Sequence, residues 1–243
     1  MSISDNNFSN FDVTAADLVT VIRESLGLKV ASTETVVNES YVTQSKKFNL
    51  TTEFLSEKNK SAHLDLMEGY IESLNNVSAK LDAVDRSDAS SNSSEFRSLK
   101  IDETYNLNAA FLHGLHFENI SDMQSQLTMD SITFMRLERD FGTFDEWQKD
   151  FIACALSTRN GWVVTVYNTF LNRYINVIVD SHNKNIPFSS FPVVVLDCWE
   201  HAYYRDYLND KKTYVHAMMK ELNWDTIDAR IKKAEKISKV TNS

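Results

Sequence analysis

The chain is poor in residues that make tight turns and cross-links: its 243 residues include five Gly, two Pro and two Cys. An all-β fold needs many tight turns, so this scarcity favours a helix-rich fold. Two cysteines, Cys154 and Cys198, provide no disulfide framework, and we interpret them as reduced, buried thiols. That interpretation fits a reducing compartment.

Long apolar runs and an excess of basic residues are also missing. No run approaches the roughly 20 apolar residues of a membrane span. The N-terminal residues show neither the apolar core of a secretion signal nor the Arg-rich pattern of a transit peptide. We therefore expect a cytoplasmic protein with no membrane partner. The formal net charge of −9 argues against a nucleic-acid partner, because phosphate contacts need clustered Lys and Arg.

Helical periodicity dominates the first half of the chain. Residues 14–26 are predicted as a short amphipathic helix and residues 28–50 as a linker. Apolar residues at three- and four-residue steps predict a long helix over 53–83 and another over 103–119. The Ser- and Asp-rich stretch 85–98 between them is predicted as a loop. Two helices joined by one loop are typical of an antiparallel hairpin.

The second half mixes strands with helices. Three β-branched, apolar runs at 162–167, 174–179 and 192–196 predict strands. Helices are predicted around them at 128–140, 144–157, 200–208, 212–222 and 225–238. The predicted fold class is therefore α+β, an N-terminal long α-hairpin followed by a three-stranded antiparallel sheet with surrounding helices.

We expect three parts along this chain. An N-terminal extension with its short helix and linker covers 1–48, a helical hairpin domain covers 49–120, and an α/β domain covers 121–243.

Asp197 and His201 lie four residues apart where the third predicted strand ends and a helix begins. A carboxylate and an imidazole in this arrangement can converge on one divalent or trivalent metal ion. For an arbitrary pair with this spacing, the alternative is an Asp that caps the helix and a surface His.

The surrounding residues favour the metal site. The stretch Asp197–Tyr204 (DCWEHAYY) is similar to the DVWEHAYY signature of iron/manganese superoxide dismutases, with Cys in place of Val. The segments RDFGTF (139–144), Gly161-Trp162 and Asn223-Trp224-Asp225 occur in the same order as in that family. The resemblance covers roughly residues 50–235.

This resemblance implies one Fe or Mn ion, with superoxide as the substrate and oxygen and hydrogen peroxide as the products. Asp197 and His201 correspond to two of the four protein ligands. A third ligand follows from Leu112–Phe117 (LHGLHF), which resembles the family pattern N-H-x-x-F-W/Y and makes His113 the candidate.

The remaining ligand lies on the first long helix, where the family has H-H-x-x-H-H-x-x-Y-V-x-x-L-N. Tyr70 matches the tyrosine of this pattern, which gates the pocket in the family. Eight residues before it stands Ala62, and His63 stands seven before it. Seven residues turn a helix through about 700° and eight through about 800°, so both positions face the tyrosine side. His63 is the candidate ligand, and a helix with Ala62 at the ligand position is the alternative.

The residues around the metal depart further from the family. The family has a Gln that tunes the metal, at a position that corresponds either to Ala109 or to the stretch 180–184 of this chain. Neither place holds a Gln here. His182 is a candidate replacement, and Lys184 is the match without a gap. Because outer partners tune a metal site, we take Tyr70 and His182 as the candidate catalytic residues.

The resemblance also implies a homodimer, formed through the region of Glu200 and Tyr204. The N-terminal helix predicts a protein partner, because an amphipathic helix is a common docking device. The alternative function is that of a catalytically reduced structural subunit with this fold in a larger assembly, for example a virion. Retention of the buried Asp and His pair favours the enzyme, because such groups are costly to bury without a partner.

Overall fold

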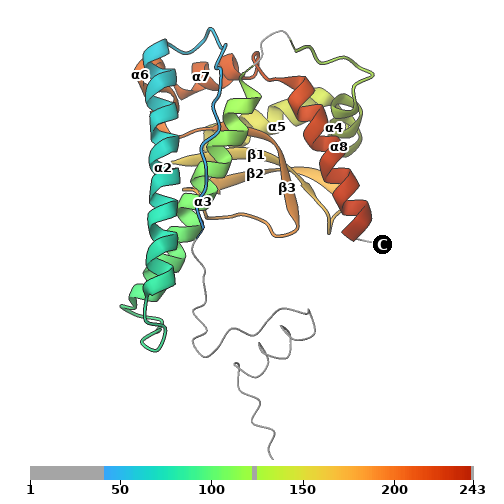
Figure 1. Ribbon diagram of the computed structural model, residues 1–243. Helices are drawn as coiled ribbons and strands as arrows, with labels where there is room; N and C mark the ends of the chain where they lie inside the picture. Colours follow the sequence, from blue (N-terminus) through green and yellow to red (C-terminus); the bar gives the residue numbers. More distant parts are fainter. Residues whose placement is uncertain (1–40, 122–124, 242–243) are drawn as a thin grey trace, which may run out of the picture. The chain divides into compact units, whose positions relative to one another are not determined.

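The structure, a computed structural model, describes residues 41–121 and 125–241 (Figure 1). The helix predicted at 14–26 lies outside the described residues. Within the described ranges, no helix is long and apolar enough to cross a membrane.

Two long helices form the predicted hairpin. Helix α2 spans Glu57–Ala83 and α3 spans Glu95–Asn119, and the two pack against each other (Figure 1). The prediction that α3 begins at 103 was wrong. The Ser94 side chain accepts a hydrogen bond from the backbone N–H of Arg97 and caps the helix there. Most side chains in the first turns of α3 face solvent, so these turns are largely polar. Leu99 is the one buried apolar side chain in them.

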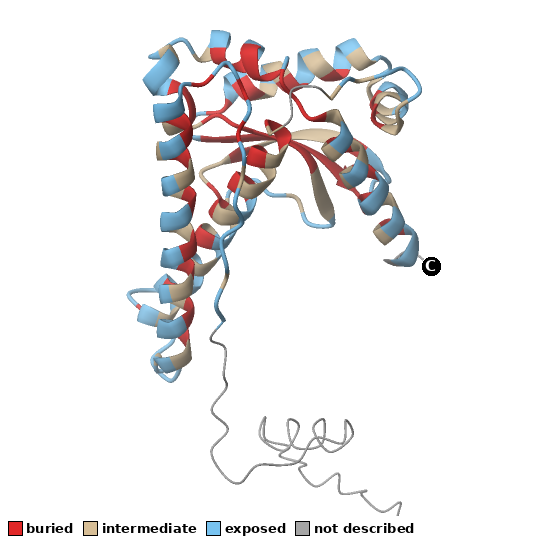
Figure 2. Ribbon diagram, turned by 45° about the horizontal axis from the view of Figure 1, so that its top comes forward, coloured by how far each residue is buried: buried red, intermediate tan, exposed pale blue. Residues whose placement is uncertain are grey.

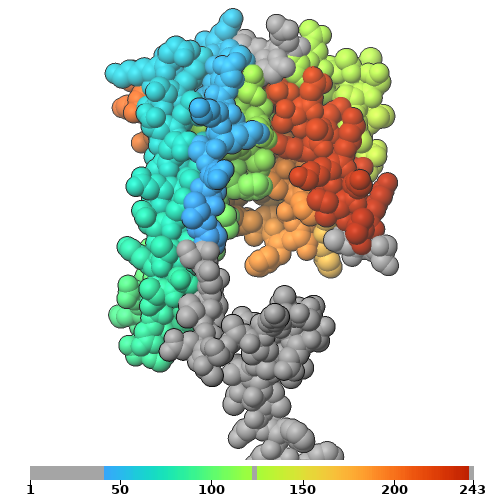
Figure 3. All heavy atoms as spheres, in the orientation of Figure 1, coloured from blue at the N-terminus to red at the C-terminus, as the bar shows by residue number. Residues whose placement is uncertain are grey.

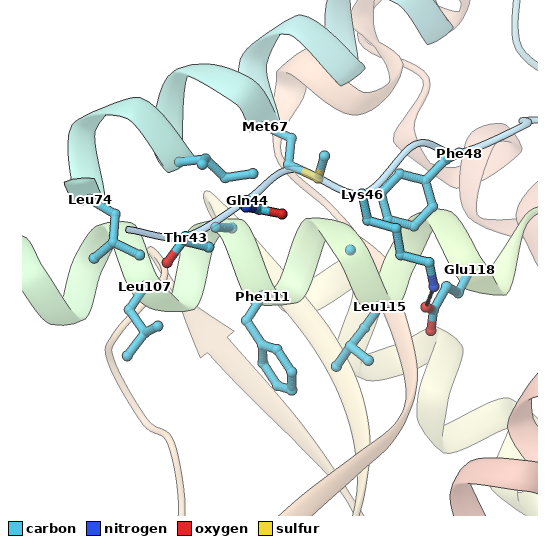
Figure 4. Close-up of a pocket in the computed structure, with 13 residues that line it drawn as sticks. Thr43, Gln44, Lys46, Phe48, Met67, Leu74, Leu107, Phe111, Leu115 and Glu118 are labelled. Carbon is cyan, nitrogen blue, oxygen red and sulfur yellow. Dashed lines mark hydrogen bonds and ion pairs between the residues drawn. The ribbon is translucent and has the colours of Figure 1, made fainter. Parts of the chain in front are cut away.

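An extended segment before α2 lies along this hairpin. The backbone N–H of Tyr41 donates to Ser78 Oγ at 2.7 Å, and that of Thr43 donates to Asn75 Oδ1 at 2.7 Å. Further along, Lys46 pairs with Glu118 of α3. Between the segment and the two helices lies a mainly apolar groove of about 250 Å³ (Figure 4). Part of the predicted linker is thus held against α2 by hydrogen bonds from its backbone N–H groups to side chains of that helix.

The sheet has three antiparallel strands in the order β2-β1-β3, which confirms the predicted fold class. The strands are β1, Gly161–Asn168, β2, Arg173–Asp180, and β3, Ser190–Asp197. Every residue of β1 is buried, since this strand is central and both of its faces are covered. An irregularity between Thr165 and Val166 shifts the register of β1 against β3.

Five further helices complete the described part of the chain. They are α4, Ile132–Phe141, α5, Phe144–Ser157, α6, Glu200–Tyr207, α7, Lys211–Met218, and α8, Trp224–Thr241. Helices α5 and α8 pack on the sheet, where Trp147 Nε1 donates to Thr165 Oγ1 at 2.9 Å. On the other face, Trp162 and Val164 of β1 form a smaller cluster with Leu112 of α3.

Burial follows these layers. In Figure 2 the central strand β1 and the inner sides of the helices are buried, whereas the outer side of α2 is exposed. Helix α3 packs against both α2 and β3, and α6 packs against α2. The end of β3 therefore lies among residues from three helices, and the candidate site residues gather there.

Candidate metal centre

Four side chains that the sequence singled out come together in space. One ligand atom from each of His63, His113, Asp197 and His201 lies within 4.8 Å of the corresponding atoms of the other three. They come from α2, α3, the end of β3 and the first turn of α6, respectively. The first three are buried and His201 is partly exposed.

The carboxylate of Asp197 is the centre of this group. Its Oδ2 atom lies 3.1 Å from His63 Nε2, 3.1 Å from His201 Nε2 and 3.6 Å from His113 Nε2. Its Oδ1 atom accepts a hydrogen bond from the backbone N–H of Trp199 at 2.9 Å. Oδ1 is thus engaged with the backbone, and Oδ2 faces the three imidazoles.

Charge is concentrated on this carboxylate. Burial raises the pKa of Asp197, but His201 and His63 outweigh that effect and hold the pKa well below its usual value. Burial lowers the pKa of both His63 and His113. Asp197 is therefore an ionised carboxylate, and His63 and His113 are neutral imidazoles, the protonation states in which these side chains bind metals.

The tautomer of His113 is fixed by the helix that carries it. Its Nδ1 atom lies 2.6 Å from the carbonyl oxygen of Ala109 and donates to it, which leaves the lone pair on Nε2. Within the described ranges, Nε2 is buried without a hydrogen-bond partner. A buried polar atom without a partner lowers the stability of the folded protein unless another group or an ion binds it. A metal ion fits, since imidazole nitrogens and a carboxylate oxygen are suitable ligands for iron and manganese.

His63, rather than Ala62, reaches this group. The side chain of His63 is 2 % exposed, and its ring packs edge-on against Phe117 at 4.8 Å and against His113 at 5.1 Å between centroids. Ala62 is only half-buried. The register of α2 thus places the histidine seven residues before Tyr70 in the interior.

Tyr70 and His182 lie beside the four side chains. The ring centroid of Tyr70 is 5.3 Å from that of His113, and its hydroxyl is 3.1 Å from His182 Nε2. His182 Nδ1 accepts a hydrogen bond from Trp162 Nε1 at 3.0 Å. Burial lowers the pKa of His182 to about 4, so its imidazole is neutral near pH 7. Lys184, the alternative from the sequence, is exposed.

Two further side chains beside the site, Tyr105 and His116, were not predicted from the sequence to belong to it. Tyr105 of α3 packs edge-on against His182 with centroids 4.7 Å apart. His116 is fully buried, and its Nδ1 accepts a long hydrogen bond of 3.4 Å from the backbone N–H of Asp197. The four-residue steps from Tyr105 through Ala109 to His113 were the available signal, because they place all three on one side of the helix.

Other sequence candidates lie at the edge of the site or in its walls. Cys198 is buried, its Sγ lies 3.7 Å from the carbonyl oxygen of Leu196, and burial raises its pKa to about 12. It is a protonated core thiol. On α6, the side chains of Glu200 and Tyr204 are exposed.

Known proteins are similar to this chain over the segment that holds Asp197 and His201 and over a large part of the whole chain. Residues 130–230 match the family model of iron/manganese superoxide dismutases, C-terminal domain. A superoxide dismutase [Fe] of Aquifex aeolicus is 33% identical over 172 residues, which cover 70% of this chain and 80% of that protein. A superoxide dismutase [Mn] of Haloferax volcanii is 34% identical over 131 residues, 54% of this chain and 65% of that protein.

Proposed function

The chain belongs to the iron/manganese superoxide dismutase family, and from this membership we propose that it converts superoxide to oxygen and hydrogen peroxide. The observation that carries the proposal is the convergence of three histidines and one aspartate on one point within the described part of the chain. Relatives named as iron and as manganese enzymes both match, so either metal is compatible with the chain.

We assign His63, His113, Asp197 and His201 as the ligands of one Fe or Mn ion. The bound ion would supply one-electron redox chemistry, which oxidises one superoxide and reduces the next. The protein's contribution is to hold the ligand atoms in place. The hydrogen bond of His113 to Ala109 and that of Asp197 to Trp199 orient two of the four side chains.

Formation of hydrogen peroxide also consumes protons, and Tyr70 and His182 hold protons beside the site. Burial, followed by the influence of Tyr105, raises the pKa of Tyr70, so its hydroxyl stays protonated at neutral pH. The neutral His182 keeps a hydrogen on Nε2, which is 3.1 Å from the Tyr70 hydroxyl. This pair is our candidate for the residues that orient and deliver protons.

Metal analysis combined with a superoxide assay tests the proposal. The full chain, expressed with iron or manganese in the medium, should contain close to one ion per chain and should consume superoxide. His113→Ala should lose both metal and activity. His216→Ala is the matched control, because His216 is exposed on α7, outside the group. A chain that folds, binds neither metal and leaves superoxide untouched would support the structural-subunit alternative.

We also propose that the chain forms a homodimer through α6. The exposed side chains of Glu200 and Tyr204 support this proposal, since the Tyr204 side chain leaves a half-exposed aromatic ring on the surface. Tyr204→Arg should shift the sedimentation coefficient from dimer to monomer. Phe170→Arg, at an 88 % exposed position between β1 and β2, should leave the dimer intact. A wild-type monomer at micromolar concentration would refute the dimer and leave the enzymatic proposal standing.

A further inference from the structure

Tyr105 touches both side chains that we assign to proton delivery. Tyr70 comes from α2, Tyr105 from α3, and His182 from the turn after β2. The ring of Tyr105 stands at 75° to that of His182 with centroids 4.7 Å apart. It also lies 6.2 Å from the ring of Tyr70 at an angle of 64°. The contact joins elements that are far apart in the sequence.

The hydrogen bonds of His182 have a defined direction. An indole N–H can only donate, so Trp162 Nε1 donates to His182 Nδ1, at 3.0 Å. The neutral imidazole then carries its hydrogen on Nε2 and donates it to the Tyr70 hydroxyl oxygen at 3.1 Å. Tyr70 accepts this bond, and its own hydroxyl hydrogen is available for a further acceptor.

Tyr105 is placed to be that acceptor. The ring of Tyr105 lies beside that of Tyr70, with centroids 6.2 Å apart, and after burial the neighbouring Tyr105 is the next cause of the raised pKa of Tyr70. Trp162 and His182 are both 0 % exposed, whereas both tyrosines are only half-buried. The two hydrogen bonds thus run in one direction, from Trp162 in the core outward to Tyr70, and Tyr105 lies beside Tyr70.

We propose that Tyr105 is a positioning residue whose hydroxyl accepts the hydrogen bond of Tyr70 and so holds the Tyr70 hydroxyl in the orientation that meets His182. Tyr105 acts through Tyr70 and does not contact the four ligand side chains in this role. The consequence for turnover rests on the proposed function, but the hydrogen bond between the tyrosines belongs to the metal-free chain.

A thermal double-mutant cycle on the full-length, metal-free protein tests the hydrogen bond. The variants are Tyr70→Phe, Tyr105→Phe and the double variant, which keep all rings and remove only hydroxyl groups. If the hydroxyl groups bond to each other, the double variant should lose less in Tm than the sum of the two single losses, by about 2 °C or more. Additive losses would overturn the proposal.

Tyr41→Phe is the matched control for the cycle. Its hydroxyl donates to Glu103 of α3 at 3.3 Å, two residues from Tyr105. Tyr41→Phe and Tyr70→Phe should therefore lower Tm additively. Non-additivity here would show that any hydroxyl bonded to α3 couples to Tyr70, and would also count against a specific role of Tyr105.

Turnover provides the second measurement. In the metal-loaded protein, Tyr105→Phe should lower kcat about three- to tenfold, the effect of one hydrogen bond, at unchanged metal content. In the Tyr70→Phe background the same change should have no further effect on kcat. A loss of similar size in both backgrounds would refute the positioning role. If the wild type has no dismutase activity, the proposed function fails, and the thermal cycle still decides whether Tyr105 positions Tyr70.

Discussion

His63 Nε2 and Asp197 Oδ2 lie 3.1 Å apart, although the two residues are separated by 134 positions in the chain. This contact joins the first long helix to the end of the sheet. It depends on a single step of helical register, because the preceding residue, Ala62, is half-buried outside the group. The register that the sequence left open is therefore central to our ligand assignment.

Replacing His63 tests that assignment directly. His63→Ala removes one of the four donor atoms, so we expect the affinity for manganese or iron to fall more than about 100-fold, a larger loss than that typical of an outer partner. Calorimetric titration of the metal-free protein measures it. Ala62→Ser is the control and should keep wild-type affinity. Equal affinities for wild type and His63→Ala would show that α2 provides no ligand.

The buried imidazole of His116 predicts a stabilising substitution. Within the part of the chain that the structure describes, its Nε2 atom has no hydrogen-bond partner, and such an atom costs roughly 1–3 kcal/mol. His116→Phe removes this atom and keeps an aromatic ring at the same buried position. We expect Tm of the metal-free protein to rise by about 2–4 °C for each kcal/mol gained. A fall in Tm would mean that the bond from the Asp197 N–H outweighs the unpaired nitrogen.

Acid should destabilise the metal-free protein well above the pH at which carboxylates titrate. Burial, followed by repulsion from His63, lowers the pKa of His116 to about 3, and burial lowers that of His182 to about 4, both from 6.5. Below pH 6.5 the unfolded chain therefore binds more protons than the folded chain. The free energy of unfolding should therefore keep its full value above pH 6.5 and should decline as the pH falls from 6.5 towards 4.

Thermal unfolding between pH 7.5 and 4.5 checks this expectation. His116→Phe removes one of the histidines with a lowered pKa, so its Tm should depend less steeply on pH than that of the wild type. Identical slopes in the two proteins would exclude His116 as a source of the acid sensitivity.

Substitution by alanine should have opposite effects on stability at two glycines, Gly161 and Gly69. A Cβ at Gly161 would meet the carbonyl oxygen of Val179 at 2.1 Å, because β1 and β2 approach closely beside Trp162. A Cβ at Gly69, in the middle of α2, would meet nothing within 4 Å. Gly161→Ala should destabilise by about 1–3 kcal/mol or more. Gly69→Ala should stabilise by up to about 1 kcal/mol, since alanine favours the helix. Urea unfolding of both variants measures the difference, and a neutral Gly161→Ala would contradict the close approach.

Local signals were sufficient for most of the fold. The apolar spacing of α2 and the β-branched runs of β1 to β3 depend on residues close in sequence, so periodicity identified these elements. The start of α3 was misplaced because Ser94 and the polar first turn resemble a loop until the cap and the burial of Leu99 are known.

The sequence by itself determined the family, through the stretch Asp197–Tyr204 and the segments that surround it, and with the family the fold class. Tertiary structure decided which side chains meet. Only the packing of α2 on α3 and α6 brings His63 to Asp197, and only the turn after β2 brings His182 to Tyr70 and Tyr105. The physical reason is that a helix of fixed period presents adjacent positions such as Ala62 and His63 to different surroundings, and the neighbouring elements determine which one is buried.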